Sequence, residues 1–200
     1  MKPSLNMSRY DADDTYCIPG SPVLKNKAGI TDQALLDQFE ADFTTIRIIE
    51  IAQNPAEGAF DLDHLCKIHF RVFQDVYEWA GDIRTVDIIR GESRFCNVLQ
   101  ICSYSDRLFE TLRKENLLVG LSLDDTSLRL AHYLSEINAI HPFREGNGRV
   151  QRLFISQLAE QAGFTLDYAA LDQAEVYQVM QASFFGNEKP LAELIAKIIA

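Results

Sequence analysis

Residues 141–152 read HPFREGNGRVQR, with one histidine, one glutamate, three arginines and two glycines in twelve residues. Gly146, Asn147 and Gly148 stand where a loop gives way to a helix, with flexible backbone on the loop side. The first N–H groups of a helix have no acceptor within it, so several of them can point at one bound anion. The three residues are therefore predicted to form a phosphate site.

Charged residues around this turn predict a polyphosphate with a bound cation. Arg149 and Arg152 are three apart on the expected helix, so they place two permanent positive charges on one face. Glu145 directly precedes the glycines, where a carboxylate would repel phosphate unless a divalent cation lay between them. Mg²⁺ bridges the phosphate oxygens of ATP in this way and takes one or two protein carboxylates. We therefore expect Glu145 to hold Mg²⁺ beside bound ATP.

His141 is the candidate general base. Pro142 favours an extended turn directly after it, which can direct the imidazole towards the anion site. An imidazole with an ordinary pKa near 6.5 can accept the proton of an attacking hydroxyl at neutral pH. Phe143, among polar neighbours, is the expected apolar anchor of the loop.

The stretch matches the signature of the Fic family, HPFx(D/E)GNGRxxR, at every defined position, and the chain resembles that family. Residues 18–27, the WAG at 79–81 followed by Arg84, and the turn at 91–95 are similar to other parts of Fic toxins. The resemblance implies AMPylation, in which a hydroxyl of a target protein attacks the α-phosphate of ATP and pyrophosphate leaves.

The resemblance also implies a role for each residue of the motif. His141 would deprotonate the target hydroxyl, and Glu145 would hold Mg²⁺. Asn147, Gly148 and Arg149 would contact the α- and β-phosphates. Arg152 would hold the γ-phosphate.

Alternating apolar residues followed by Gly91 predict a β-hairpin between Arg84 and Cys96. This hairpin resembles the Fic flap, to which a segment of the target protein adds as an extra strand. Arg94 and Phe95 are the predicted target-contacting residues. The alternative is a hairpin that merely covers the core.

Fic enzymes are restrained by a helix bearing (S/T)xxxE(G/N), whose glutamate pairs with the second arginine of the motif. Neither the first nor the last predicted helix contains that string. The literal match TLRKEN at 111–116 lies after the flap, and we interpret it as coincidence. The resemblance therefore predicts the toxin of a toxin–antitoxin pair, inhibited by a small helical antitoxin that supplies the glutamate to Arg152.

Apolar periodicity and breaker residues predict an all-α Fic-type helical bundle with a short β-hairpin flap. The first helix starts at Thr31 or Asp32, ends at Asn54-Pro55 and carries Leu36, Phe39, Phe43 and Ile46 as its apolar stripe. The other helices are expected near 61–77, 98–115, 124–141, 147–163, 172–184 and 191–199. A single Fic domain would span 31–200, after an extended N-terminal arm at 1–30.

Composition excludes several other classes of function. The 200 residues carry a net charge of −10, which gives no basic field for direct nucleic-acid binding. Nothing approaches the roughly 18 apolar residues of a membrane span, and the first ten residues lack a secretory apolar run, so we expect a cytoplasmic protein. The four cysteines, Cys17, Cys66, Cys96 and Cys102, form no Cys-x-x-Cys pair and are expected to be buried or half-buried thiols.

Three other functions stay open. A Fic-fold enzyme could transfer phosphate or another phosphate-linked group, although Gly148, where phosphate-transferring relatives carry a larger residue, favours AMP. A non-catalytic regulator could bind nucleotide only. A zinc hydrolase built from His132, His141 and Glu145 is weak, because no His-Glu-x-x-His string occurs. His64 and His69 are interpreted as structural helix residues.

Overall fold

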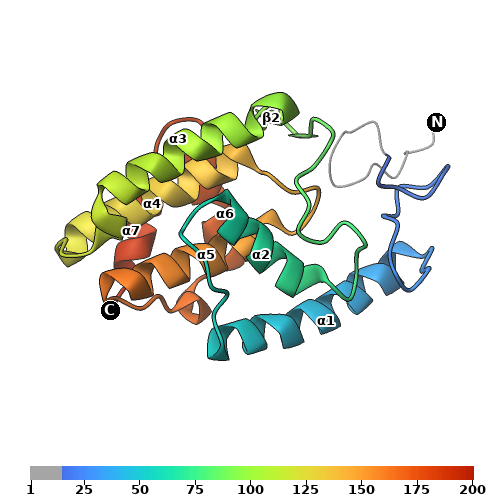
Figure 1. Ribbon diagram of the computed structural model, residues 1–200, viewed down its shortest axis with the longest axis horizontal. Helices are drawn as coiled ribbons and strands as arrows, with labels where there is room; N and C mark the ends of the chain where they lie inside the picture. Colours follow the sequence, from blue (N-terminus) through green and yellow to red (C-terminus); the bar gives the residue numbers. More distant parts are fainter. Residues whose placement is uncertain (1–14) are drawn as a thin grey trace.

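The computed structural model describes residues 15–200, and the regular structure of this part is mostly helical (Figure 1). The helices are α1 (Gln33–Gln53), α2 (Leu62–Phe73), α3 (Ile101–Lys114), α4 (Leu123–Ile140), α5 (Asn147–Ala162), α6 (Gln173–Phe184) and α7 (Lys189–Ile198). The strands β1 (Ile89–Arg90) and β2 (Ser93–Arg94) pair antiparallel, with Ile89 opposite Arg94. The predicted all-α class with a β-hairpin is confirmed.

Four helices have a short polar residue as N-cap, at positions where the sequence predicts that a helix begins. Asp32 accepts a hydrogen bond from the Leu35 N–H, and Asp61 accepts one from the His64 N–H, both at 2.9 Å. Ser122 and Asp172 cap α4 and α6 in the same way. These caps satisfy N–H groups that have no acceptor inside the helix. Gly163, with φ +94°, ends α5 as predicted.

Helix α5 lies in the middle of the bundle and carries residues 147–152 of the motif at its N-terminal end (Figure 1). It packs against α4 on one side and α2 on the other, while α7 covers α4 and α1 covers α2. Val150, Phe154 and Leu158 of α5 are fully buried, as their spacing predicts. The first turn of α5 is thereby held between α4 and α2.

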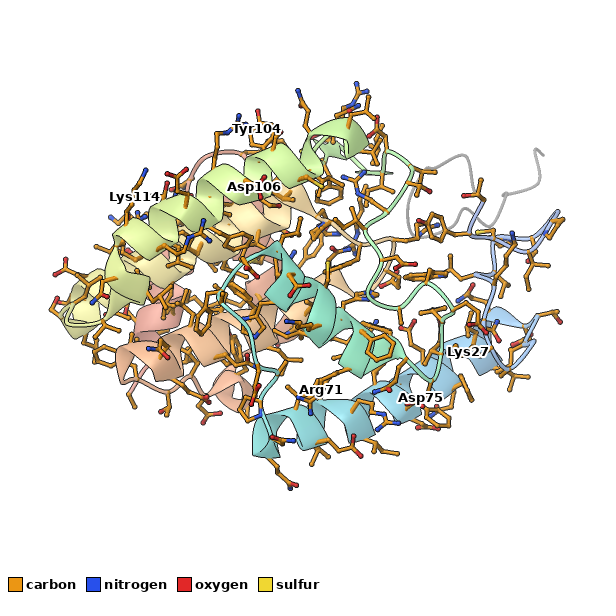
Figure 2. All side chains as sticks on the ribbon, in the orientation of Figure 1. Lys27, Arg71, Asp75, Tyr104, Asp106 and Lys114 are labelled. Atoms are coloured by element: carbon orange, nitrogen blue, oxygen red, sulfur yellow. The ribbon has the colours of Figure 1, made fainter. Side chains whose placement is uncertain are left out.

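Two elements are shorter than predicted. Helix α2 ends at Phe73 rather than near Tyr77, and the residues after it form a turn in which the Val76 and Tyr77 N–H groups both donate to the Phe73 carbonyl. The carboxylate of Asp75 accepts hydrogen bonds from Arg47 of α1 (Figure 2), and the Val76 carbonyl accepts one from the Lys27 N–H. In the hairpin, regular pairing is limited to two residues on each strand, and side-chain contacts hold the flanking segments instead.

The predicted apolar stripe of α1 is wrong in half of its members. Leu36 is buried, but Phe43 and Ile46 are exposed to 37% and 55%. The inward face runs instead through Leu36, Glu40, Thr44 and Ile51, which are spaced by one or two helical turns. Two polar residues on an inward face require partners inside the molecule.

Residues 15–30 contain no helix, and an isolated bridge joins Cys17 to Leu24. Residues 1–14 of the predicted arm lie outside the described residues, so the arm stays a prediction. The four cysteines are free, and Cys17, Cys66 and Cys96 are buried or half-buried as predicted, but Cys102 is exposed, so the prediction is wrong for that residue. Within residues 15–200, no helix combines the length and the apolar character that crossing a membrane would require.

Candidate active site

The loop between α4 and α5 is closed by the side chain of its last residue. Asn147 accepts a hydrogen bond from the Phe143 N–H at 3.0 Å and donates one to the Phe143 carbonyl at 2.7 Å. Both polar groups of this buried amide are thus used within the loop. The side chain of Asn147 therefore shapes the loop, and its contact with phosphate stays a prediction.

The turn at Gly146 requires glycine. Its φ is +81°, and a Cβ at this position would lie 2.1 Å from the ring of Phe73. The backbone is therefore pressed against that ring in a conformation which side chains disfavour. Gly148 differs, because a Cβ there would meet only the Arg152 guanidinium, at 3.4 Å. The space beside Gly148 is open towards Arg152, where a bound phosphate would lie.

Glu145 stands at the entrance of this turn with its carboxylate 9% exposed. One carboxylate oxygen accepts a hydrogen bond from the Gly146 N–H at 2.9 Å and lies 3.7 Å from Arg149. A single carboxylate next to a phosphate cradle is the protein contribution that Mg²⁺ takes when phosphate oxygens and water complete its shell. The residues present therefore fit the predicted cation.

His141 follows α4 in the left-handed conformation, with φ +48°, and its side chain is buried. Its Nδ1 lies 3.1 Å from the carbonyl of Asn138, so Nδ1 carries the proton and Nε2 carries the lone pair. Burial, with smaller contributions from Arg84 and Arg90, lowers the pKa of His141 to about 3. The imidazole is thus neutral at physiological pH, which is the form a general base needs.

Arg84 fixes the backbone around His141 from the start of the flap segment. Its fully buried guanidinium donates to the carbonyls of His141 at 2.9 Å and Val86 at 2.6 Å, and also to that of Cys96. The Arg84 N–H donates to the Pro142 carbonyl at 2.9 Å. One side chain therefore joins the flap segment to the end of α4.

His69 of α2 performs a similar task on the other side of the loop. Its Nδ1 accepts a hydrogen bond from the Gly81 N–H at 2.8 Å, and its Nε2 donates to the Glu145 carbonyl at 3.1 Å. The ring stacks on Phe143, with the ring centroids 4.1 Å apart. Burial lowers the pKa of His69 to about 3, so the ring stays neutral. This histidine is structural, as predicted, but its contacts hold the peptide that carries the candidate metal ligand.

The two arginines of the motif have different surroundings. The Arg149 guanidinium donates to Glu40 at 2.6 Å and to Thr44 at 3.2 Å, both on α1. Arg152 lies three residues on, exposed on the same face of α5, and pairs with no carboxylate among residues 15–200. Sequence spacing places the arginines together correctly, but it does not reveal the partner of Arg149 on α1.

The two predicted flap residues, Arg94 at the end of β2 and Phe95 directly after it, differ in exposure. Arg94 is exposed, whereas Phe95 is buried and stacks on the imidazole of His141, with centroids 3.8 Å apart. Phe95 also meets Phe184 of α6 edge to face. Contact of Arg94 and Phe95 with a target stays a prediction, and the location of Phe95 adds a contact with the candidate base.

Two other features of the sequence lie away from the site. Glu115, in the TLRKEN string, accepts two hydrogen bonds from Arg129, at 2.9 and 2.7 Å. His132, of the zinc-hydrolase alternative, faces Glu188 at 3.3 Å. Nine residues of helix α4 separate His132 from His141, which corresponds to about 13 Å of rise. His132 and His141 are therefore not brought together.

Sequence reasoning missed Glu40 as a residue of the site. A partial signal was present, because Glu40 lies one turn from both Leu36 and Thr44 on a stripe that ends at Ile51. A charged residue on such a stripe requires a partner, although the spacing cannot say which one.

Comparison with known proteins supplies a family match. The model of the Fic/DOC family matches residues 59–159. "Protein adenylyltransferase VbhT" of Bartonella schoenbuchensis is 42% identical over 96% of this chain, which spans 40% of that protein's length. "Probable protein adenylyltransferase Fic" of Salmonella typhimurium is 37% identical over 94% of this chain and 92% of its own length.

Solved structures with the same fold have been crystallised with nucleotides. The N-terminal Fic domain of a putative cell filamentation protein from Bartonella quintana, with bound ADP, superposes with a TM-score of 0.86 at 27% identity, covering 92% of this chain and 94% of its own. BepC of Bartonella tribocorum, with bound AMPPNP, gives a TM-score of 0.86 at 27% identity over 98% of this chain and 99% of its own.

Proposed function

The chain belongs to the Fic/DOC family, and we propose that it is a protein adenylyltransferase that moves AMP from ATP to a hydroxyl side chain of a target protein. One observation carries the proposal. The neutral imidazole of His141, with its lone pair on Nε2, adjoins the loop that leads to the glycine-lined first turn of α5. A base and a phosphate cradle are thus held by a single loop.

The chemistry follows from these positions. Nε2 of His141 removes the proton from the target hydroxyl, whose oxygen attacks the α-phosphorus of ATP while the bond to pyrophosphate breaks. Backbone N–H groups of the first turn of α5, with Arg149 and Arg152, stabilise the negative charge on the phosphates. Mg²⁺, held by Glu145 with phosphate oxygens, would neutralise further charge when bound.

The position of the radioactive label in ATP tests the reaction. Lysate proteins incubated with the purified chain should become labelled by ATP carrying ³²P at the α-position and not by ATP carrying it at the γ-position. His141→Ala should abolish the labelling, and His132→Ala, on the same helix, should leave it unchanged. Labelling from the γ-position alone would support the phosphotransferase alternative. AMPPNP binding without either label would support the nucleotide-binding regulator.

The proposal includes docking of the target on the flap. The two-stranded sheet β1–β2 has one neighbour for each strand among residues 15–200, so an outer edge is available for a further strand. Arg94→Ala should reduce labelling of the target at least several-fold and leave AMPPNP affinity unchanged. Equal labelling by the variant and the wild type would contradict a role for Arg94.

We further propose that the chain acts in the cytoplasm as a toxin held inactive by a small helical antitoxin. The support is that Arg152, which an inhibitory glutamate would engage, has no carboxylate partner among residues 15–200. The purified chain should therefore label lysate proteins without activation, and co-expression with a small protein encoded beside it should suppress the labelling. Labelling that no such protein alters would contradict this role.

A further inference from the structure

The carboxylate of Glu40 lies at the centre of a hydrogen-bonded group that ends on Arg149. Its Oε1 accepts a hydrogen bond from Arg149 at 2.6 Å, and its Oε2 accepts one from the hydroxyl of Tyr77. Thr44, one turn further along α1, accepts a second bond from Arg149 at 3.2 Å. The side chains of Glu40 and Arg149 are only 13% and 21% exposed, so water screens this pair weakly.

An aromatic ring fixes the guanidinium of Arg149 from another direction. Its central carbon lies 4.7 Å from the ring centroid of Phe73. The same ring is the one that a Cβ at Gly146 would strike. Phe73 therefore forms a common wall behind Arg149 and behind the glycine turn, and the guanidinium is held beside the phosphate cradle.

Arg149 has guanidinium N–H groups that its hydrogen bonds to α1 do not use. A guanidinium carries five N–H groups in a rigid planar fork, and the bonds to Glu40 and Thr44 use one on each terminal nitrogen. The others can be donated to phosphate oxygens. Glu40 therefore sets the orientation of the guanidinium, and the N–H groups that Glu40 and Thr44 do not use remain able to bind a ligand.

We propose that Glu40 is a positioning residue for adenylyl transfer, which, with Tyr77 and Thr44, holds the guanidinium of Arg149 ready for the phosphates of ATP. The inference rests on the proposed function and extends it to α1, which precedes the segment that the family model matches. A long side chain that is ordered beforehand loses no further freedom when the ligand binds. Misplacement of such a group by about 1 Å lowers reaction rates strongly.

The opposite role makes the opposite prediction. If Glu40 competed with phosphate for Arg149, its removal would release the arginine and strengthen nucleotide binding. If Glu40 positions Arg149, its removal weakens binding. The sign of the change therefore decides between positioning and inhibition.

The test measures AMPPNP affinity in the presence of Mg²⁺ by calorimetry. Glu40→Ala should weaken binding about tenfold, which corresponds to ordering one long side chain on binding. Glu40→Gln, which keeps an oxygen for Arg149, should lie between Glu40→Ala and the wild type. Tyr77→Phe, which removes only the hydroxyl, should weaken binding several-fold. The matched control is Glu50→Gln, because Glu50 also pairs with an arginine, Arg47, on the same helix but away from the site.

A double-mutant cycle separates positioning from a general loss of structure. Arg149→Ala alone should weaken AMPPNP binding, and adding Glu40→Ala should weaken it no further, because Glu40 acts through Arg149. Additive losses would overturn the proposal, as would unchanged or tighter binding by Glu40→Gln. Thermal unfolding of each variant shows whether it folds, and Tyr77→Phe keeps the test decisive if Glu40→Ala does not.

Failure of this inference is distinguishable from failure of the proposed function. Absence of label transfer by the wild type would refute adenylyl transfer, whereas the AMPPNP affinities would still report on Glu40. Transfer of the α-label by the wild type, with Glu40 variants that match it in affinity, would refute the role of Glu40 alone.

Discussion

The ring of Phe95 lies on the imidazole of His141, with the two centroids 3.8 Å apart and the planes 22° from parallel. This contact joins the flap to the candidate base and contributes to the burial that lowers the pKa of His141 to about 3. The flap therefore sets the electrostatic environment of the base as well as offering an edge to a target.

Phe95→Ala should make the rate of AMP transfer sensitive to acid. Hydration of the imidazole raises its pKa towards the ordinary value near 6.5, so a growing fraction of the base is protonated below that pH. Initial rates measured from pH 5 to 8 should show no fall caused by His141 in the wild type and an acid limb near pH 6 in the variant. Phe185→Ala, at an exposed ring directly after α6, is the control. Identical pH profiles would contradict this role of Phe95.

Stability should rise with pH between about 4 and 6.5. Burial lowers the pKa of His141 and of His69 to about 3, and it also lowers that of His64. His141 and His69 are neutral in the folded protein over this window and gain a proton on unfolding below pH 6.5, so the unfolded state binds more protons there, and the lowered pKa of His64 acts in the same direction. Each contributes up to about 1.4 kcal/mol of unfolding free energy per pH unit in that window. Urea unfolding at several pH values measures the slope, and His69→Phe should reduce it by about one proton.

Alanine at the two glycines of the motif should separate folding from binding. Gly146→Ala forces a side chain into φ +81° and against Phe73, so we expect a loss of about 3 kcal/mol in stability. Gly148→Ala adds a methyl group where only Arg152 lies near, so stability should change by less than about 0.5 kcal/mol.

The same pair of variants should differ in nucleotide binding. The methyl group of Gly148→Ala occupies space beside the phosphate cradle, so AMPPNP affinity should fall roughly tenfold. Urea unfolding and calorimetry measure the two effects. A destabilised Gly148→Ala protein, or one with full affinity, would contradict this assignment of the open space.

Arg84→Met should destabilise the protein although the volume is nearly kept. The change leaves the buried carbonyls of His141, Val86 and Cys96 without their shared donor. Since each buried unsatisfied acceptor costs about 1–3 kcal/mol, we expect a total of at least about 3 kcal/mol. Lys114→Met, at an exposed residue of α3, is the control in the same urea titration. A loss below about 1 kcal/mol would show that water replaces the guanidinium.

The helices and the loop of the motif could be predicted because their signals are local. Asp32, Asp61 and Asp172 cap helices within three residues of themselves, and the glycines of the motif act within one turn. The end of α2 could not be predicted in this way, because the buried Val76 and Tyr77 continue the apolar spacing while the Val76 carbonyl accepts its hydrogen bond from Lys27, outside the helix. Local spacing carries no information about such a partner.

The surroundings of the site depend on partners distant in the sequence. Glu40 precedes Arg149 by 109 residues, and His69 precedes Glu145 by 76. On α1, the functional polar residues occupy the inward face, and this is why the apolar stripe through Phe43 and Ile46 was wrong. The rule that the inward face of a helix is apolar fails most often where a site requires polar groups inside the protein.

The amide of Asn147 closes the loop onto Phe143 with both of its polar groups, so contacts within the loop alone fix its shape. A nucleotide therefore binds to a loop whose conformation is already fixed, and the conformational entropy of ordering that loop has been lost during folding. Other chains that share the twelve-residue motif would then present nearly the same loop conformation to ATP. Differences in their affinity for ATP should then come from residues outside the motif that contact its side chains, such as Glu40.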